Sequence, residues 1–372
     1  MAKKKKLEKK KRRRVRPKDW ENTHEDSFTH DLVKHRRATV KLSESAQESN
    51  PLPTGFECNG LVISHSKKWA FVMMGDEERL CIIDERMKED GATLLAPGDN
   101  VYIEFEEDEA IVRGVGERRT KLSRPGGTDA RLGEQILAAN LDLLIVVAAA
   151  ADPPFRPGLV DRYLIAAQRG GIKPVLCINK MDLVDEPPAE LEAYRDLGID
   201  IVFTSCEDES GLADLREMLH GKLAVLSGHS GVGKSSLLNA IEPNLELHTQ
   251  AISGATNKGK HTTSASRLYT LGDAIRIIDT PGIRALGLIG VSPEEVAWYF
   301  PEIAEAAVGC RFRDCTHTHE PRCGVQDALQ SGDLNQGRYD SYLRIRASLE
   351  SHNNTTPGRL APHWTGEEHP KL

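Results

Sequence analysis

The spacing of apolar residues changes along the chain and marks out segments of different periodicity. Short apolar or alternating runs, separated by Gly- and Pro-containing turns, occupy residues 60–63, 69–72, 79–82, 101–105 and 110–112. Five short strands within roughly sixty residues predict a small β-barrel, for which an OB-fold is favoured and an SH3-like barrel is the alternative. This segment contains few aromatic residues for stacking on single-stranded nucleic acid.

From about residue 140 the pattern becomes one of apolar runs that alternate with amphipathic stretches. Strands are predicted at residues 141–149, 174–178, 201–203, 223–226 and 274–278, and helices at residues 157–169, 189–197, 212–219 and 236–241. Near-continuous apolar strands between helices predict an α/β fold with a mostly parallel sheet covered on both faces. From about residue 296 the chain is predicted to be helical.

The charge is distributed unevenly. Residues 1–18 hold twelve Lys and Arg and one acid, a net charge of +11. The whole 372-residue chain has a net charge of −7, so the remaining residues carry −18. Such an arm has too little apolar surface to fold alone, and residues 1–50 are expected to be disordered. It is either a solvated tail or an arm that binds nucleic-acid phosphates. The acidic remainder favours a structured RNA–protein partner over arbitrary nucleic acid.

Membrane insertion is not expected. The longest apolar stretch, residues 143–151, is far shorter than the ~20 residues that span a bilayer, and no apolar signal-peptide core follows the basic start. We therefore expect a cytoplasmic protein.

A complete phosphate-binding pattern, G-x-x-x-x-G-K-[ST], is preceded by an apolar strand and followed by a helix. Its residues are Gly228, His229, Ser230, Gly231, Val232, Gly233, Lys234 and Ser235. Glycines let the backbone N–H groups approach phosphate oxygens at a helix N-terminus. Lys234 is predicted to meet the β/γ phosphates and Ser235 to bind Mg²⁺.

A guanine-reading pattern, Asn179-Lys180-Met181-Asp182, ends a predicted strand. The carboxylate of Asp182 can accept both guanine donors, N1–H and the N2 amine, a pair that adenine lacks. Lys180 is expected to cover the base with its aliphatic stem. The small residues around Ser205 resemble the loop whose backbone N–H meets guanine O6.

A third pattern, Asp279-Thr280-Pro281-Gly282, follows another strand. Asp279 is predicted to hold Mg²⁺ through water and Gly282 to sense the γ-phosphate. In an ordinary GTPase the phosphate loop precedes the other two patterns, whereas here the base-reading pattern comes first. This order is a circular permutation of a GTPase domain.

The residues that position the attacking water are less defined. Ile283 stands where Ras-like enzymes carry a water-orienting glutamine, so slow intrinsic turnover is expected. Switch I should lie around residues 259–263, where Thr262 or Thr263 would reach Mg²⁺. His261 is the best polar candidate for a catalytic role, with a solvated loop histidine as the equally weighted alternative.

Three cysteines and a histidine form a cluster in the helical C-terminal segment, with the spacing C-x₄-C-x-H-x₅-C: Cys310, Cys315, His317 and Cys323. Three thiolates and one imidazole complete a tetrahedral Zn²⁺ site with no open position, which predicts one structural ion. His319 is a rival ligand.

Together these motifs closely resemble one family, the bacterial small-subunit-dependent ribosomal GTPases (RsgA), over roughly residues 55–345. The resemblance rests on residues 179–182, 228–236, 259–263 and 279–282 and on the Cys₃His spacing. It implies a GTPase that acts late in maturation of the small ribosomal subunit, binds its rRNA and is stimulated by the subunit. The family also carries a hydrophobic residue where Ile283 stands, and its switch histidine has been suspected of a catalytic role.

The resulting prediction is a monomer with GTP or GDP, Mg²⁺ and Zn²⁺ as ligands. The predicted nucleotide-binding residues are Asn179, Lys180, Met181, Asp182, Ser205, Gly282 and residues 228–236, which end at Ser236. The predicted divisions are an arm at residues 1–50, the barrel at 51–117, the GTPase domain at 118–295, the zinc module at 296–350 and a tail at 351–372. The alternatives are a GTP-dependent RNA or ribosome clamp with incidental hydrolysis, and a metabolic P-loop kinase, which Asn179 and Asp182 argue against.

Overall fold

The computed structural model describes residues 56–89, 92–107, 109–125, 134–242, 266–272, 274–279 and 288–354. The predicted basic arm, residues 259–263 with His261, Thr262 and Thr263, and the predicted Gly282 and Ile283 lie outside the described residues.

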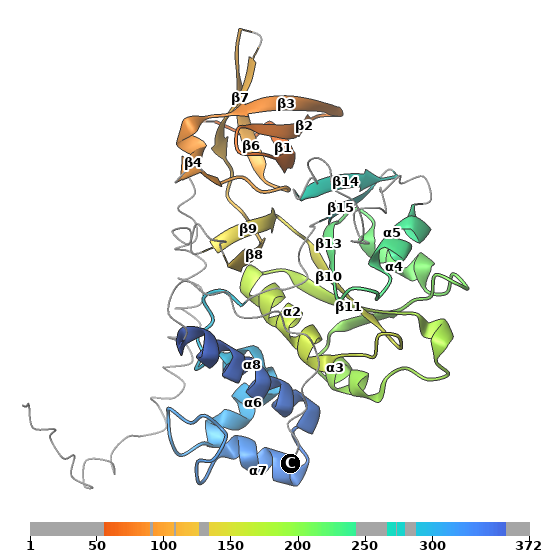
Figure 1. Cartoon of the computed structure of the whole chain (residues 1–372), viewed down its shortest axis with the longest axis vertical. Coiled ribbons are helices and arrows are strands. Elements are labelled where there is room, and N and C mark those ends of the chain that lie inside the picture. The colour runs from red at the N-terminus through yellow and green to blue at the C-terminus, as the bar shows by residue number, and fades with distance from the viewer. Residues whose placement is uncertain are drawn as a thin grey trace, which may run out of the picture. The chain divides into compact units, whose positions relative to one another are not determined.

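The N-terminal strands form a closed barrel (Figure 1, orange). They are β1 (Gly60–His65), β2 (Trp69–Met74), β3 (Glu77–Ile83), β6 (Asn100–Glu106) and β7 (Glu109–Val115). Their order is β1-β2-β3-β7-β6, with a β1–β6 pairing that closes the ring. The β3–β7 pair is parallel and the other pairs are antiparallel, which is the OB arrangement. The predicted five-stranded barrel is confirmed.

Alternation along these strands builds the barrel core. Val62, Val72, Cys81, Ile103 and Val112 are all at most 2% exposed and belong to one cluster, whereas Ile63, next to Val62, packs in the cluster of the GTPase region. Cys81 is therefore a small core residue.

Six strands of the GTPase region form the mostly parallel part of one eleven-stranded sheet, which continues into the barrel. The strands are β10 (Leu143–Ala149), β11 (Lys173–Asn179), β12 (Asp200–Phe203), β13 (Leu223–Ser227), β14 (Arg267–Leu271) and β15 (Ile275–Asp279). Their order is β12-β11-β10-β13-β15-β14, and only the β14–β15 pair is antiparallel. β14 also pairs with β1 of the barrel, at Arg267 and Ser64.

Helices cover both faces of this sheet, as predicted. They are α2 (Pro157–Gly170), α3 (Glu192–Asp196), α4 (Leu212–Leu219) and α5 (Lys234–Ile241). Within β10, Leu144 and Val146 pack in the cluster that contains residues of α2 and α3, whereas Ile145 and Val147 pack in the cluster that contains residues of α4 and α5. Strands that are apolar on both faces are therefore buried by helices on both sides.

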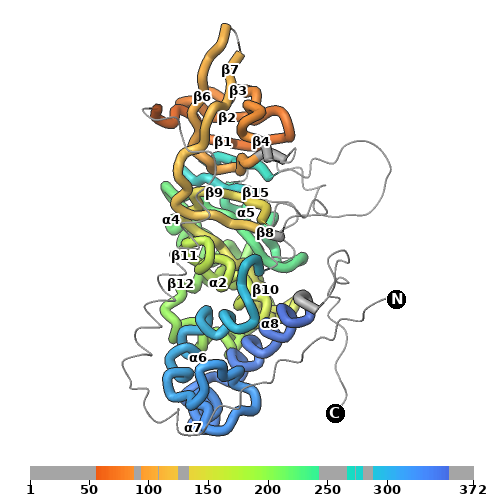
Figure 2. The backbone as a smooth tube through the Cα atoms, turned by 90° about the vertical axis from the view of Figure 1, so that its left-hand side faces the viewer, coloured from red at the N-terminus to blue at the C-terminus, as the bar shows by residue number. Residues whose placement is uncertain are grey.

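The C-terminal segment is helical and has its own core (Figure 2, blue). Its helices are α6 (Pro301–Ala306), α7 (Gly324–Ser331) and α8 (Gln336–Asn354), and α8 continues beyond the predicted module boundary at residue 350. Val296, Phe300 and Tyr342 are at most 1% exposed, and Ile165 of α2 belongs to the same cluster. Residues of the GTPase region thus share a core with the C-terminal module.

Short elements complete the fold. They are the strands β4 (Lys88–Glu89), β5 (Ala92–Thr93), β8 (Lys121–Pro125) and β9 (Glu134–Ala139), and the 3₁₀ turns η2 (Glu85–Met87), η3 (Met181–Leu183), η4 (Ala189–Leu191), η6 (Val296–Tyr299) and η7 (Ala307–Gly309). The β8–β9 hairpin and β14 are absent from the sequence prediction because their polar and apolar residues do not alternate cleanly. Among the described helices, none has the length and apolar character needed to cross a membrane.

Candidate nucleotide-binding site and metal cluster

The predicted nucleotide-binding motifs follow strands of one sheet. β11 ends at Asn179, β13 ends at Ser227 just before the phosphate loop, and β15 ends at Asp279. These three strands run parallel within the sheet, so their carboxyl ends lie at one edge. In open α/β sheets that edge is where ligands bind.

The phosphate loop depends on glycines whose backbone conformation excludes a side chain. Gly233 has φ of 92°, and a Cβ there would lie 2.2 Å from Asn179 Nδ2. Gly228 has φ of 154°, and a Cβ there would lie 2.1 Å from the carbonyl oxygen of Val147. The loop can therefore pack against β10 and Asn179 only because both positions lack a side chain.

Lys234 begins α5 directly after this loop. Its Nζ donates hydrogen bonds to the carbonyl oxygens of Gly228, at 2.9 Å, and His229, at 2.7 Å. These bonds fold the ammonium over the loop, where a bound phosphate would also lie. Ser235, on the first turn of α5, is half-buried, while Ser230, Gly231 and Ser236 are exposed at the loop surface.

Asn179 joins the base-reading pattern to the phosphate loop. Its side chain is 2% exposed, and Nδ2 donates a 2.9 Å hydrogen bond to the carbonyl oxygen of Val232. Its Oδ1 accepts a 3.2 Å hydrogen bond from the hydroxyl of Thr204. A buried amide that satisfies both its donor and its acceptor holds the loops after β11, β12 and β13 in one arrangement.

Asp182 is exposed and is held by Ser205. The Ser205 hydroxyl donates a 2.6 Å hydrogen bond to Asp182 Oδ1 and accepts the backbone N–H of Glu207, at 3.1 Å. Lys180 adopts φ of 62°, and its Nζ donates to the carbonyl oxygen of Asp152. The carboxylate therefore points from the sheet edge in a defined direction, which suits a base reader.

The loop containing Thr204 and Ser205 was predicted to act through its backbone, and sequence reasoning missed the part played by their side chains, which hold Asn179 and Asp182. Thr204 and Ser205 are both fully buried, whereas short polar residues after a strand are usually solvated. Their only sequence signal is their position directly after β12, a strand that lies beside β11 in the sheet.

Burial keeps the cysteine next to this network unreactive. Burial raises the pKa of the Cys177 thiol to about 12, and its Sγ lies 3.4 Å from the Thr204 hydroxyl. Cys177 therefore packs as a neutral core residue.

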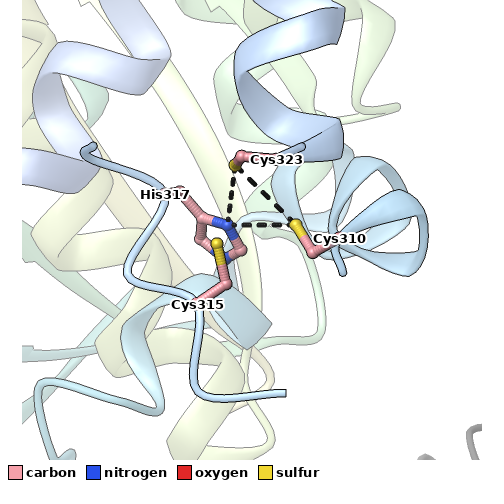
Figure 3. Close-up of side chains that lie close together, drawn as sticks. All are labelled: Cys310, Cys315, His317 and Cys323. Atoms are coloured by element: carbon pink, nitrogen blue, oxygen red, sulfur yellow. Dashed lines mark hydrogen bonds between the residues drawn. The ribbon is translucent and has the colours of Figure 1, made fainter. Parts of the chain in front are cut away.

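The four predicted metal ligands come together in the C-terminal module (Figure 3). One ligand atom from each of Cys310, Cys315, His317 and Cys323 lies within 4.8 Å of all the others. The Nδ1 of His317 is 3.5 Å from the sulfurs of both Cys310 and Cys323. His319, the rival ligand, is exposed, and its Nδ1 lies 2.8 Å from the Thr318 hydroxyl.

Polar side chains around the cluster fix the loop that carries His317. The carbonyl oxygen of His317 accepts hydrogen bonds from Gln326 Nε2, at 2.6 Å, and from the Tyr339 hydroxyl, at 2.7 Å. Burial alone would raise the pKa of Glu320, but its carboxylate accepts hydrogen bonds from the hydroxyl of Thr316 and from the backbone N–H of Thr316, the latter at 2.7 Å, and these bonds hold the pKa well below the usual range. Three thiols and an imidazole fixed at this separation are compatible with tetrahedral Zn²⁺.

The sheet order and the chain order of its motifs define the class of protein. The strand that carries the base-reading residues comes before the strand that launches the phosphate loop, yet both lie at one sheet edge joined by Asn179. This is a circularly permuted P-loop GTPase, preceded by an OB barrel and followed by a helical Cys₃His module.

Comparison with known proteins identifies the family. The family model described as RsgA GTPase matches residues 115–289. The small ribosomal subunit biogenesis GTPase RsgA of Gemmatimonas aurantiaca is 43% identical over 267 residues, which cover 70% of this chain and 86% of that protein. The protein of the same name from Chlorobaculum parvum is 40% identical over 271 residues, covering 70% and 87%. The chain belongs to the RsgA family of GTPases.

Solved structures show the same architecture. YjeQ from Thermotoga maritima matches with a TM-score of 0.62 and 31% identity, over 78% of this chain and 98% of that one. YloQ, described as a circularly permuted GTPase, matches with a TM-score of 0.59 and 30% identity, over 79% and 95%.

Proposed function

We propose that this chain hydrolyses GTP in the presence of Mg²⁺ as a late maturation factor of the small ribosomal subunit, whose rRNA it binds. The observation that carries the proposal is the buried Asn179 amide, which joins the base-reading strand to the phosphate loop of a permuted GTPase. The relatives from Gemmatimonas aurantiaca and Chlorobaculum parvum are named for biogenesis of that subunit, which supports this choice of partner.

GTP would bind along the carboxyl edge of the sheet. Asp182 would accept the N1–H and N2 amine of guanine, and Lys180 would cover the base, with Met181 and Ser205 beside it. Residues 228–236 would surround the phosphates with backbone N–H groups, and Lys234 would exchange its bonds to the loop carbonyls for bonds to the β/γ phosphates.

Ser235 and Asp279 would hold Mg²⁺, together with Thr262 or Thr263 of switch I, and Gly282 would sense the γ-phosphate. The bound ion supplies positive charge against the phosphate oxygens. Ile283 cannot orient water, so intrinsic hydrolysis would be slow and His261 would position the attacking water.

The role of His261 can be tested directly. His261→Ala should lower the subunit-stimulated kcat while nucleotide affinity stays nearly unchanged, because the imidazole would contact the water and not the nucleotide. Steady-state hydrolysis and fluorescent-nucleotide titration measure the two quantities. Normal turnover of this variant with small subunits present would assign the water to another group.

The remaining parts of the chain would serve attachment to the subunit. We propose the barrel at residues 51–117 and the basic arm at residues 1–50 as rRNA-binding parts, and the module at residues 296–350 as a part held by one structural Zn²⁺ on Cys310, Cys315, His317 and Cys323. The GTPase domain would occupy residues 118–295 and the tail residues 351–372. The protein would act in the cytoplasm as a monomer.

Turnover in the presence of purified ribosomal subunits tests the proposal. Small subunits should raise kcat at least about tenfold, and large subunits or bulk rRNA should not, because GTP would order switch I for one specific bound state. Deleting residues 1–18 should weaken subunit binding and flatten its salt dependence without changing the intrinsic rate. Equal stimulation by either subunit would contradict the proposal.

A further inference from the structure

Three large apolar side chains lie exposed on one face of the barrel. Trp69 is 44% exposed, Phe71 is 40% exposed and Leu80 is 49% exposed. Trp69 and Phe71 alternate with buried Ala70 and Val72 on β2, and Leu80 lies directly opposite Phe71 on β3. None of the three belongs to the core clusters formed by the described residues.

This outward surface, the β2–β3 face, coincides with the part of an OB barrel that binds nucleic-acid strands in other proteins of this fold. Large apolar side chains that lie next to one another on a protein surface often mark an interaction site. Flat aromatic side chains suit unpaired bases, since every base offers a π-face for stacking. Aromatic residues are few in this barrel, but Trp69 and Phe71 stand two positions apart on β2, on the side that faces solvent.

The charges around the β2–β3 face differ between its two ends. Lys67 and Lys68 are exposed in the turn that precedes Trp69, and Ser66 fixes that turn by accepting the Trp69 backbone N–H at 3.2 Å. At the opposite end, Asp76 and Glu77 are exposed in and after the β2–β3 turn. A nucleic-acid strand on this face would therefore run its phosphates past the lysines, with its bases over Trp69 and Phe71.

A residue of the GTPase region borders the same face. The Arg267 guanidinium lies 5.8 Å from the centre of the Phe71 ring and 2.9 Å from both carboxylate oxygens of Glu78. Arg267 begins β14, and in the β14–β15 pair it lies opposite Asp279, the predicted Mg²⁺ residue. A base stacked on Phe71 would thus lie next to Arg267 of β14. The strand β14 pairs directly with β15, which ends at Asp279.

We propose that the β2–β3 face is a stacking platform for an unpaired segment of rRNA, with Trp69 and Phe71 under the bases and Lys67 and Lys68 beside the phosphates. This inference rests on the proposed function, because it names the surface through which part of the small subunit is held. The occupant is single-stranded RNA, since aromatic rings next to two lysines match bases next to phosphates.

Binding measurements on the full chain test the platform. The double variant Trp69→Ala/Phe71→Ala should bind a fluorescein-labelled, unstructured RNA 12-mer at least about tenfold more weakly, and small subunits should also bind more weakly, because stacking on two rings is lost. Trp69→Tyr/Phe71→Tyr should recover most of the affinity. Lys67→Ala/Lys68→Ala should reduce the salt dependence of 12-mer binding by about 0.7 per lysine in the logarithmic slope.

Phe105→Ala is the matched control, because Phe105 is 50% exposed on β6 of the same barrel, and its ring lies beside the Arg79 guanidinium, 5.3 Å away. This control should bind the 12-mer like the wild type, and all variants should keep wild-type GTP affinity and intrinsic turnover. Equal loss in the control and the double variant, or no loss in either, would overturn the platform.

Two further outcomes separate the hypotheses. If the double variant loses affinity for subunits but the 12-mer binds it as it binds the wild type, the face docks a ribosomal protein and the RNA assignment is wrong. If wild-type protein neither binds nor responds to small subunits, the proposed function fails, while the 12-mer measurements still decide the platform.

Discussion

At the end of the sheet edge that we propose reads the guanine base, a hydroxyl holds a carboxylate in place. Ser205 donates to Asp182 at 2.6 Å, and Ser205 is itself fully buried and held by the loop after β12. The direction of the carboxylate is thus set before nucleotide arrives, which reduces the ordering cost of binding.

Asp182→Asn should weaken GTP binding at least tenfold, because two charged hydrogen bonds of roughly 1.5–3 kcal/mol each are lost or weakened. The same variant should shift preference towards XTP, whose C2 carbonyl can accept from an amide. Competition titrations with GTP, ATP and XTP measure the shift. Asp185→Asn, at a second exposed carboxylate just beyond the base-reading motif, should behave as wild type. Unchanged GTP affinity in Asp182→Asn would remove Asp182 from base recognition.

A single glycine decides whether the phosphate loop can meet the base-reading strand. Gly233→Ala should reduce nucleotide affinity more than tenfold, because its Cβ would collide with the buried Asn179 amide at 2.2 Å. Gly221→Ala is the control, since Gly221 also has positive φ, 70°, but no atom lies within 4 Å of its added Cβ. Both variants carry a backbone cost of ~1–2 kcal/mol. Equal nucleotide affinity in the two variants would show that the contact with Asn179 has no role.

At the scale of elements, a buried charge cluster fastens α8 to α2. Arg338 on α8 is 4% exposed, donates to Asp161 on α2, and donates to Glu302 on α6 at 2.6 Å. Its guanidinium also lies 4.4 Å from the centre of the Phe300 ring. The C-terminal module is therefore held to the GTPase region by a buried ion pair, and removing either partner leaves the other charge buried and uncompensated.

Arg338→Met should destabilise the protein by roughly 3 kcal/mol, because it leaves the Asp161 carboxylate buried without its partner. Burial raises the pKa of Asp161, and loss of the Arg338 charge would raise it further. A folded-state pKa above the unfolded one favours the folded protein at low pH, so the deficit should grow as pH rises from 5.5 to 7.5. Urea denaturation at both pH values measures the deficit.

Two variants serve as controls for the Arg338 prediction. Arg344→Met, at an exposed position of the same helix, should cost little at either pH. Asp161→Asn/Arg338→Met should recover part of the loss, because no unpaired charge stays buried. A deficit in Arg338→Met that does not vary with pH would contradict the role given to Asp161.

At the scale of the whole molecule, the Cys₃His cluster and the proposed nucleotide site lie against separate cores. The cysteine ligands belong to the C-terminal cluster, whereas the phosphate loop packs with α4 and α5 of the GTPase region. The C-terminal core can therefore lose stability while the GTPase region still binds nucleotide.

Cys315→Ser should lower zinc from about one ion per chain and unfold the C-terminal module, while nucleotide binding persists, because closed Cys₃His coordination couples metal binding to local folding. Elemental analysis, hydrogen exchange and nucleotide titration measure the three effects. Cys58→Ser, at a half-buried cysteine outside the cluster, should retain metal and structure. Freshly purified protein without zinc would defeat the prediction.

Much of this protein follows from local sequence. The five barrel strands, the alternating strands and helices, and the permuted motif order are all encoded in residues close together along the chain, where periodicity and spacing can be read directly. The ligand cluster is likewise local, since it spans residues 310–323.

Tertiary structure alone decided the features that depend on distant residues. The strand β14 has a weak local pattern, and one of its two partners is the distant barrel strand β1, which pairs with it at Ser64 and Arg267. Arg338 meets Asp161 across a separation of 177 residues, and Arg267 meets Glu78 across 189. Whether Trp69 and Phe71 face the core or solvent likewise depends on which side of β2 the barrel closes around. Such contacts are selected by the free energy of the whole fold, and no short stretch of sequence contains them.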